Sequence, residues 1–327
     1  MEKNILLVGY RDKSHSSAGG YDRIINNPNV DSLLGENVPF GFIPVSKRGK
    51  ILNVFFLDLI ARFKRFNYKV VHFFYGDTLL IPFIKLRHHK IVATIHMDID
   101  DNKRFKKLFL YVLRHIDGVI VLSSNQQKKL KETYHIESVF IPHGFAKPVF
   151  KKVNMNIDDS KINVSILGQN YRDYRAIKEA VEFCLEYNRL VHFHLIGQSE
   201  NFKNEIQSFA NVTCYPRLSD DEYFSVLSSC DYNYLPVTFA TANNALLEAQ
   251  FLGIHSILPA IPGIMDYAAP KPLNLFYDSI KEMKKIFAGL RKKSYSKDLV
   301  LYSKRFEWDC VYEQLNAYYD YLIEKEK

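Results

Sequence analysis

The feature that most constrains this chain is a regular alternation of short apolar segments with helical stretches, which runs through both halves of its 327 residues. The apolar segments have the length and composition of buried strands, beginning with Asn4–Gly9. Strands that alternate with helices usually pair in parallel, because each helix carries the chain back along the sheet. Strands are expected in the first half at 4–9, 38–43, 69–74, 91–95, 118–122 and 138–142, and helices at 51–66, 103–115 and 124–132.

The alternation breaks at residues 142–144 and restarts after a polar, linker-like stretch, Lys147–Lys161. A last helical stretch, about 309–325, has no obvious strand partner and could pack back across the domain boundary. The sequence therefore predicts an α/β chain of two doubly wound, Rossmann-like domains that face each other across a cleft. We expect the first domain at 1–150 with 306–327, and the second at 151–305, with strands at 163–168, 191–197, 212–215, 232–235 and 254–258 and helices at 173–188, 201–209 and 219–229.

Positive charge is concentrated in the first half of the chain. Residues 1–150 carry 23 Lys and Arg against 13 Asp and Glu, whereas residues 151–327 carry 21 against 23. This asymmetry predicts contact with something anionic, such as a membrane surface, nucleic acid or an acidic substrate. The sequence contains no zinc finger, RNP aromatic motif or P-loop, which argues against nucleic acid.

The overall composition, 47% hydrophobic and 24% charged, is that of a globular protein. No apolar run is long enough to span a bilayer, and we expect no signal peptide before the first strand. The four cysteines are well separated and form no CxxC pair, so neither a zinc site nor a disulfide framework is expected. A reducing cytoplasm fits these features best.

The stretch 231–253, DYNYLPVTFATANNALLEAQFLG, reads as a short strand, a polar turn and a helix. Backbone N–H groups at the helix start, around Asn243, Asn244 and Ala245, would favour an anion such as a diphosphate. An ordinary turn capped by Asn or Thr is the alternative that these residues leave open. Glu248 lies one turn further on, where its carboxylate could accept hydrogen bonds from ribose hydroxyls; a solvated surface glutamate is the alternative.

Ligands of doubly wound sheets bind beyond the carboxyl ends of the strands, which singles out other residues. Gly19 and Gly20 lie in the loop after the first strand, without the spacing of a GxGxxG fingerprint. His96 directly follows a strand and could hydrogen-bond a substrate hydroxyl or polarise a leaving group, or it could be structural. Arg172 could neutralise a diphosphate, or it could be an exposed loop residue.

Two further patterns have both a functional and a structural interpretation. Asp98 and Asp100 form a DxD pair typical of metal binding, but capping of the basic helix that follows explains them better. The segments 57–69 and 103–114 mix basic, aromatic and aliphatic residues at helical spacing and could lie on an anionic membrane surface. Ordinary helices flanking a sheet have a similar composition.

Several motifs, in order along nearly the whole chain, resemble the GT-B glycosyltransferases of the group 1 family, commonly called family 4. AGGYDRII is similar to the GG-x-E-R helix start, TIHMD to the TxHD or TxHG strand end, and VIVLSSNQQKKL to the ad-x-vi-x-x-S strand and serine turn. IPHGF is similar to IPNGV before the linker. RFEWDCVYEQLNAYYDYL resembles the terminal F-x-W-x-x-v-a-x-x-y helix, which in the family crosses back to the first domain.

The stretch 231–253 is similar to the family's E-x7-E nucleotide-sugar motif, with two departures nearby. Glu248 matches the second glutamate, which in the family contacts the ribose, whereas Ala240 stands at the first, which faces the donor sugar. Where the family has an arginine and a lysine that grip the diphosphate, Gln169 stands at the arginine position. Arg172 is expected to take the role of the lysine.

The resemblance implies transfer of a sugar from a nucleotide diphosphate sugar to a hydroxyl of a glycan or lipid-linked acceptor, with retention of configuration, in surface polysaccharide or glycoconjugate synthesis. It implies no metal or other cofactor. The protein would be cytoplasmic, or peripheral on the inner face of the cell membrane. The expected site comprises His96 and Arg172 for catalysis, His15 and Tyr75 for the acceptor, and Gly19, Gly20, Gly168, Gln169, Arg172, Asn243, Asn244, Ala245 and Glu248 for the donor.

The missing glutamate at Ala240 motivates a second hypothesis, a non-catalytic nucleotide-sugar-binding subunit that supports a partner transferase. A nucleotide-sugar epimerase on the same fold is a third. The sequence does not distinguish these from a transferase.

Overall fold

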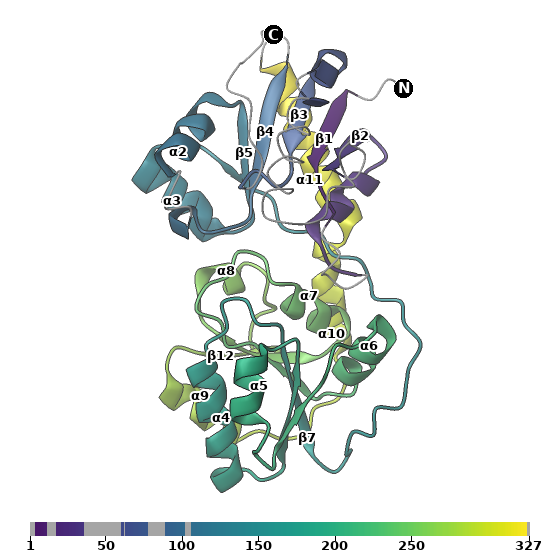
Figure 1. Cartoon of the computed structure of the whole chain (residues 1–327), viewed down its shortest axis with the longest axis vertical. Coiled ribbons are helices and arrows are strands. Elements are labelled where there is room, and N and C mark those ends of the chain that lie inside the picture. The colour runs from purple at the N-terminus through teal and green to yellow at the C-terminus, as the bar shows by residue number, and fades with distance from the viewer. Residues whose placement is uncertain are drawn as a thin grey trace. The chain divides into compact units, whose positions relative to one another are not determined.

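The computed structural model describes residues 4–11, 18–35, 60–61, 63–77, 89–101 and 106–325. The chain forms two compact units (Figure 1), each built on a six-stranded parallel sheet. The first unit comprises Met1–His15, Gly20–Gly144 and Phe306–Lys327, and the second comprises Ser16–Gly19 and Phe145–Arg305.

The sheet of the first unit has the strand order β2-β1-β3-β4-β5-β6. Its strands are almost entirely buried apolar runs, as a parallel sheet covered on both faces requires. The strands are β1 (Ile5–Gly9), β2 (Val30–Leu34), β3 (Val70–Phe73), β4 (Lys90–Ile95), β5 (Gly118–Val121) and β6 (Val139–Phe140). The helices are α2 (Lys106–His115), α3 (Ser124–Tyr134), α11 (Trp308–Glu324) and the 3₁₀ turns η1 (Tyr21–Asn26), η3 (Arg65–Asn67) and η4 (Ile99–Asp101).

The sheet of the second unit has the order β12-β11-β10-β7-β8-β9. Serine side chains cap several of its helices; Ser219 and Glu222, for example, form a complete capping box at the start of α6. The strands are β7 (Ile162–Leu167), β8 (Val191–Ile196), β9 (Val212–Cys214), β10 (Tyr232–Tyr234), β11 (His255–Pro259) and β12 (Leu275–Tyr277). The helices are α4 (Tyr174–Tyr187), α5 (Glu200–Ile206), α6 (Asp220–Ser228), α7 (Asn244–Phe251), α8 (Pro262–Met265), α9 (Ile280–Ala288) and α10 (Lys297–Ser303), followed by η5 (Lys304–Phe306).

Each sheet has one point at which the strand order changes direction. In the first unit the chain goes from β1 outward to β2 and then to β3 on the other side of β1. In the second unit it goes from β7 through β8 to β9 and then to β10 on the other side of β7. The connections leave in opposite directions there, which opens a crevice beyond the carboxyl ends of the two strands. These two points are where a ligand site is expected in each unit.

The last helix, α11, is an integral part of the first unit. The hydroxyl of Tyr312 donates to the carbonyl of Arg23 at 2.8 Å, and the hydroxyl of Tyr319 lies 2.6 Å from Nδ1 of the buried His72. At the start of the helix, the indole of Trp308 lies against Gly144, where any added Cβ would overlap the ring. The expectation that the C-terminal helix returns to the first domain is confirmed.

The predicted α/β fold with two doubly wound, Rossmann-like units is confirmed, and the differences concern particular elements. The strand β2 at 30–34 was not expected, and the segment after Gly20 is a 3₁₀ turn rather than an α-helix. The strand expected at 38–43 and most of the helix expected at 51–66 fall outside the described residues. The sequence interpretation also missed β12, α9 and α10, which follow the last strand that it recognised.

Replacing Trp308 by Ala should destabilise the first unit by about 3–5 kcal/mol, because it removes a buried indole and leaves a cavity beside Gly144. Urea unfolding followed by circular dichroism would measure the change. Tyr321→Ala is the control, since Tyr321 lies on the same helix with more than half of its surface exposed. Equal destabilisation by both substitutions would contradict this account of the helix.

Candidate functional site

In the second unit, the turn after β7 brings an arginine over a glycine at the topological switch point. Gly168 has a positive φ of 70°, and a Cβ there would lie 3.3 Å from the guanidinium of Arg172. Arg172 donates from Nε to the carbonyl of Leu167 at 2.9 Å and from Nη1 to that of Asn170 at 2.9 Å. Burial lowers the pKa of this guanidinium to about 10, so it remains cationic at neutral pH.

This turn is attached to the turn after β10. Arg172 and Val237 form an antiparallel bridge, and the backbone N–H of Asp173 donates to the carbonyl of Pro236 at 2.9 Å. The N–H of Thr238 donates to the carbonyl of Tyr171 at 3.0 Å. Because β7 and β10 are neighbours in the sheet, these bonds hold the two strand-end turns of the switch point together.

The helix α7 begins where the second turn ends. The side chain of Asn243 is its N-cap and accepts from the N–H of Leu246 at 3.4 Å; Asn244 and Ala245 form the first turn. The expected helix start is confirmed, and the Asn243 cap is the one named in the alternative interpretation of this turn. Ala240, in the turn before the cap, is buried. Gly263 of α8 lies so close to it that a Cβ on Gly263 would overlap the Ala240 carbonyl oxygen.

Glu248 is buried, with only 4% of its surface exposed, so the interpretation of this residue as a solvated glutamate is excluded. The hydroxyl of Tyr223, from α6, donates to its Oε2. Burial raises the pKa of Tyr223 well above its usual value, the charge of Glu248 raises it further, and Arg172 is near enough to oppose the rise. Tyr223 thus contacts Glu248 directly and lies within electrostatic range of Arg172. Sequence reasoning missed it because one tyrosine in an amphipathic helix gives no signal.

In the first unit, His96 stands at the carboxyl end of β4 with its ring held from several sides. Its Nε2 donates to the carbonyl of Phe74 at 2.7 Å. The ring lies edge-on to Tyr21, with centroids 4.7 Å apart, and 4.8 Å from the ring of Tyr75. Tyr75 in turn stacks on Tyr10 at 4.4 Å, beyond the ends of β3 and β1. The structure therefore brings the predicted residues His96 and Tyr75 together at the switch point of this unit.

A carboxyl group that the sequence interpretation did not single out lies beneath the His96 turn. Asp77 accepts from the backbone N–H of His96 at 2.7 Å. Burial raises the pKa of Asp77 to about 7, although hydrogen bonds from the N–H groups of His96, Met97 and Asp77 itself act against the rise. Its position shortly after the strand 69–74, next to Gly76, is the signal that could have identified it.

Other predicted site residues are separated or fall outside the described part. Gly20, with a φ of 96°, precedes η1 in the first unit, whereas the adjacent Gly19 is grouped with the second unit. His15 lies outside the described residues. Gln169 is exposed at the turn after β7, where its carbonyl accepts from the backbone N–H of Arg172 at 3.4 Å.

The acidic pair after β4 is occupied by protein cations. Lys129 lies 2.6 Å from Asp98 and 2.5 Å from Asp100, and Asp100 also accepts from Lys106 and from the hydroxyl of Tyr134. These hydrogen bonds hold the pKa of Asp100 below its usual range. Within the part of the chain that the structure describes, no group of three or more His, Cys, Asp or Glu side chains could hold a metal ion.

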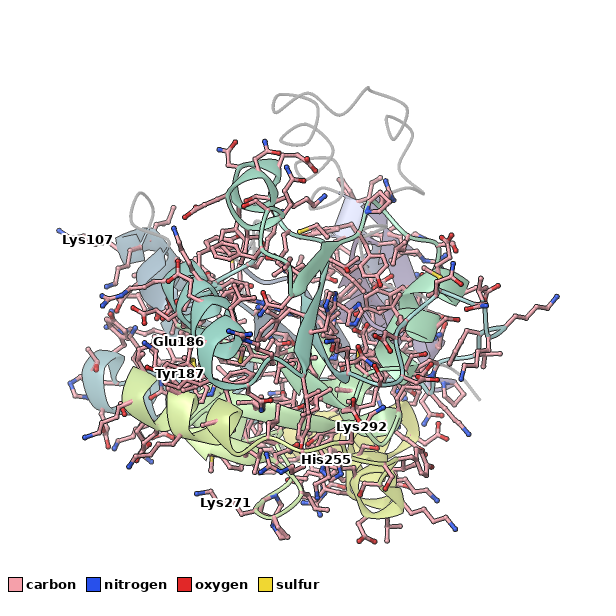
Figure 2. The ribbon with its side chains drawn as sticks, turned by 90° about the horizontal axis from the view of Figure 1, so that it is seen from below. Lys107, Glu186, Tyr187, His255, Lys271 and Lys292 are labelled. Atoms are coloured by element: carbon pink, nitrogen blue, oxygen red, sulfur yellow. The ribbon has the colours of Figure 1, made fainter. Side chains whose placement is uncertain are left out.

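Several large apolar side chains of the basic first unit are exposed. Leu108 and Tyr111 of α2 are 48% and 51% exposed, and Phe63 and Phe66 are exposed further still. Lys107, beside Leu108, extends into solvent (Figure 2). Among the described residues, no helix is both long enough and apolar enough to cross a bilayer.

The sequence profile of Glycosyltransferase Family 4 matches residues 18–146. No curated protein sequence matches the chain. Sucrose-phosphate synthase from Thermosynechococcus elongatus is 16% identical, with a TM-score of 0.67 over 98% of this chain and 89% of that one. Anabaena Alr3699/HepE, solved with UDP and glucose, is 12% identical, with a TM-score of 0.68 over 96% of this chain and 98% of that one.

The lipopolysaccharide outer core galactosyltransferase WaaB is 13% identical, with a TM-score of 0.65 over 99% of both chains. At such low identities, these structures show the fold, which is GT-B. The family match over residues 18–146 and this fold together support the resemblance to the group 1, family 4 glycosyltransferases that the sequence indicated.

The raised pKa of Asp77 predicts a pH dependence of stability. The pKa of Asp77 is about 7 in the folded state and 3.8 ordinarily. The protonated carboxyl therefore contributes its full stabilisation of the folded state below pH 3.8, and this contribution is lost as the pH rises through 7. Asp77→Asn should therefore flatten the fall in the first unit's free energy of unfolding between about pH 4 and pH 8.

Urea unfolding at a series of pH values measures this slope. Asp320→Asn, at an exposed aspartate of α11, is the control and should leave the slope unchanged. If Asp77→Asn leaves the slope unchanged as well, the carboxyl group is not the one that titrates.

Proposed function

We propose that the protein transfers a sugar from a nucleotide diphosphate sugar to a hydroxyl group of a glycan or lipid-linked acceptor, with retention of anomeric configuration. The observation that carries the proposal is the cluster at the switch point of the second unit. There Tyr223 donates a hydrogen bond to the buried Glu248 of α7, the cationic Arg172 is near enough to Tyr223 to oppose the rise in its pKa, and α7 begins at the turn attached to that of Arg172. These three features match the diphosphate and ribose of one nucleotide.

The diphosphate would lie against Arg172 and the first N–H groups of α7. A helix N-terminus and a desolvated guanidinium both stabilise negative charge, and that charge increases as the sugar–phosphate bond breaks. Fixed donors of this kind act on the leaving group without reorganising. Catalysis would therefore consist mainly of leaving-group stabilisation and positioning.

The ribose would be held by Glu248, whose carboxylate accepts hydrogen bonds from sugar hydroxyls while Tyr223 fixes its orientation. UDP, the ligand in the Alr3699/HepE structures, contains both the ribose and the diphosphate that this cluster fits. A uridine diphosphate sugar is accordingly the first donor to test.

His96, Gly19 and Gly20 would contribute on the donor side, and Tyr75 and His15 toward the acceptor; of the described residues, His96, Gly20 and Tyr75 belong to the first unit and Gly19 to the second. The ring of His96 is oriented by Phe74 and two tyrosines, so it could meet a substrate hydroxyl without reorganisation. The family resemblance further supports a role in surface polysaccharide or glycoconjugate synthesis, and a mechanism without a metal or other cofactor.

Ala240 favours one alternative function, a nucleotide-sugar-binding subunit without activity of its own. The position lacks the carboxylate that faces the donor sugar in similar glycosyltransferases, and α8 packs closely against its carbonyl. The two functions differ in one measurable property. A transferase releases UDP from its donor in the presence of acceptor or slowly by hydrolysis, whereas a binding subunit leaves the donor intact.

Arg172→Ala should weaken UDP binding by about 1.5–3 kcal/mol, roughly 10- to 150-fold in Kd, because a charge-assisted contact is lost. Glu248→Gln should weaken UDP binding about tenfold and reduce the preference for UDP over 2′-deoxy-UDP. Isothermal titration measures the affinities, and detection of released UDP measures turnover of UDP-sugars.

Arg175→Ala is the matched control, because the Arg175 side chain is 84% exposed and lies three residues beyond the proposed site. It should bind UDP as the unmodified protein does. Tight UDP binding that survives Arg172→Ala would contradict the placement of the donor. UDP binding without turnover of any tested donor, with or without acceptors, would favour the binding subunit.

We also propose that the exposed apolar and basic side chains of α2 attach the protein to the inner face of a membrane. Co-sedimentation with phosphatidylglycerol vesicles at low salt should show binding, and Leu108→Glu with Tyr111→Glu should reduce it at least fivefold. Leu301→Glu, at a 66% exposed position of α10, is the control. Absence of binding by the unmodified protein contradicts the attachment.

A further inference from the structure

The outer face of α4 and α9 in the second unit carries a pair of glutamates on one helix and a pair of lysines on the other, while α4 also presents Arg175 and Lys178 nearer its start. One helical turn apart on α4, Glu182 and Glu186 are exposed on the side away from the sheet. One helical turn apart on α9, Lys281 and Lys285 are exposed in the same way. We call these residues, with the groove between the helices, the α4–α9 face.

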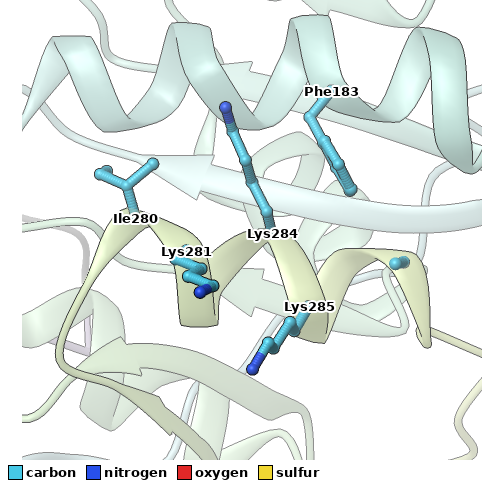
Figure 3. Close-up of a pocket in the computed structure, with 6 residues that line it drawn as sticks. Phe183, Ile280, Lys281, Lys284 and Lys285 are labelled. Carbon is cyan, nitrogen blue, oxygen red and sulfur yellow. The ribbon is translucent and has the colours of Figure 1, made fainter.

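The groove between the two helices is apolar, with a volume of about 450 Å³. Phe183 points into it from α4, and α9 lines it with Ile280, Ala288 and the three lysines Lys281, Lys284 and Lys285 (Figure 3). Tyr187 stacks on Phe183 with ring centroids 4.6 Å apart and is itself 61% exposed. Figure 2 shows Glu186 and Tyr187 next to each other at the end of α4. The face thus combines an apolar centre with charged edges, as protein interfaces do.

The two helices run in the same direction and are in register. Both follow strands of one parallel sheet, β7 and β12, so both run back from the carboxyl edge of the sheet. Lys284 lies 2.5 Å from Glu179 and 5.8 Å from the centroid of the Phe183 ring. Because Glu179 and Phe183 are one turn apart, the middle of α9 lies beside the middle of α4.

This register makes the face complementary to itself. A twofold axis perpendicular to the groove, close to Phe183, sets α4 of one copy antiparallel to α9 of the other. Glu182 of one copy then lies opposite Lys285 of the other, and Glu186 lies opposite Lys281. Both contacts form together because the two glutamates and the two lysines are each one helical turn apart. The same rotation places Tyr187 of one copy opposite Ile280 of the other. The Phe183 rings of the two copies meet near the axis.

We propose that the α4–α9 face binds the α4–α9 face of a second copy of this chain, forming a symmetric dimer through the second unit. Two short helices from each copy form an interface smaller than the standard size of about 800 Å² per partner, so the dimer is weak and reversible. Since its edges are held by exposed ion pairs, it weakens as the salt concentration rises. The proposal is independent of the proposed function.

Sedimentation equilibrium of the full chain, up to about 100 µM protein at low salt, should show a monomer–dimer equilibrium. Glu182→Lys with Glu186→Lys, and separately Lys281→Glu with Lys285→Glu, should each weaken the dimer at least tenfold, because every edge pair becomes repulsive. Circular dichroism would verify that both variants are folded. The control is Glu132→Lys with Glu313→Lys. It makes the same change in net charge as Glu182→Lys with Glu186→Lys, but on the exposed surface of the first unit, and should leave the dimer intact.

Mixing the two charge-reversed variants gives the decisive result. One variant then has only lysines at the four edge positions and the other has only glutamates, so a mixed dimer regains all of its attractive pairs. A mixed dimer that forms where neither variant dimerises alone supports the proposal. A monomer at all concentrations, dimers unaffected by the reversals, or no recovery on mixing would overturn it and assign the groove to a different partner.

Discussion

The attachment between the turns after β7 and β10 is the constraint on which the candidate site depends. Two neighbouring strands end there, and their connections leave in opposite directions. The hydrogen bond from the Asp173 N–H to the Pro236 carbonyl and the bridge between Arg172 and Val237 join the two turns. Without them, the arginine and the start of α7 would belong to two independent loops, and a nucleotide would have to order both on binding.

The polar groups of the site are held by hydrogen bonds within the protein. Arg172 is fixed by carbonyl oxygens of its own turn, and Glu248 by Tyr223 from a different helix. Side chains fixed in this way lose little entropy when a ligand binds, which is how rigid sites gain affinity. In the first unit the same logic applies to His96, whose ring is held by the Phe74 carbonyl and two aromatic rings and whose backbone N–H donates to Asp77.

The sequence was sufficient to predict the architecture and the residues whose motifs are local. Alternating strands and helices imply a parallel sheet, and Asn243 before an apolar helical run predicts a capped helix, because both depend on short-range spacing. Contacts between distant segments were not predictable in this way. Tyr223 reaches Glu248 across 25 residues of chain, and Asp77 becomes significant only because β3 and β4 are neighbours. The strand β2 was missed because VDSLL has a polar centre, which occupies the edge of the sheet.

We assign the departure at Ala240 to the sugar, and Arg172 and Glu248 to the nucleotide. Ala240 is buried with its carbonyl against Gly263 of α8, whereas Glu248 accepts from Tyr223, which lies within electrostatic range of Arg172. Hydrogen–deuterium exchange of the protein with and without UDP tests this central claim most directly. The account predicts protection by UDP at residues 168–172 and 241–248 of the second unit. Absence of protection there at saturating UDP, or protection confined to other segments, would contradict it.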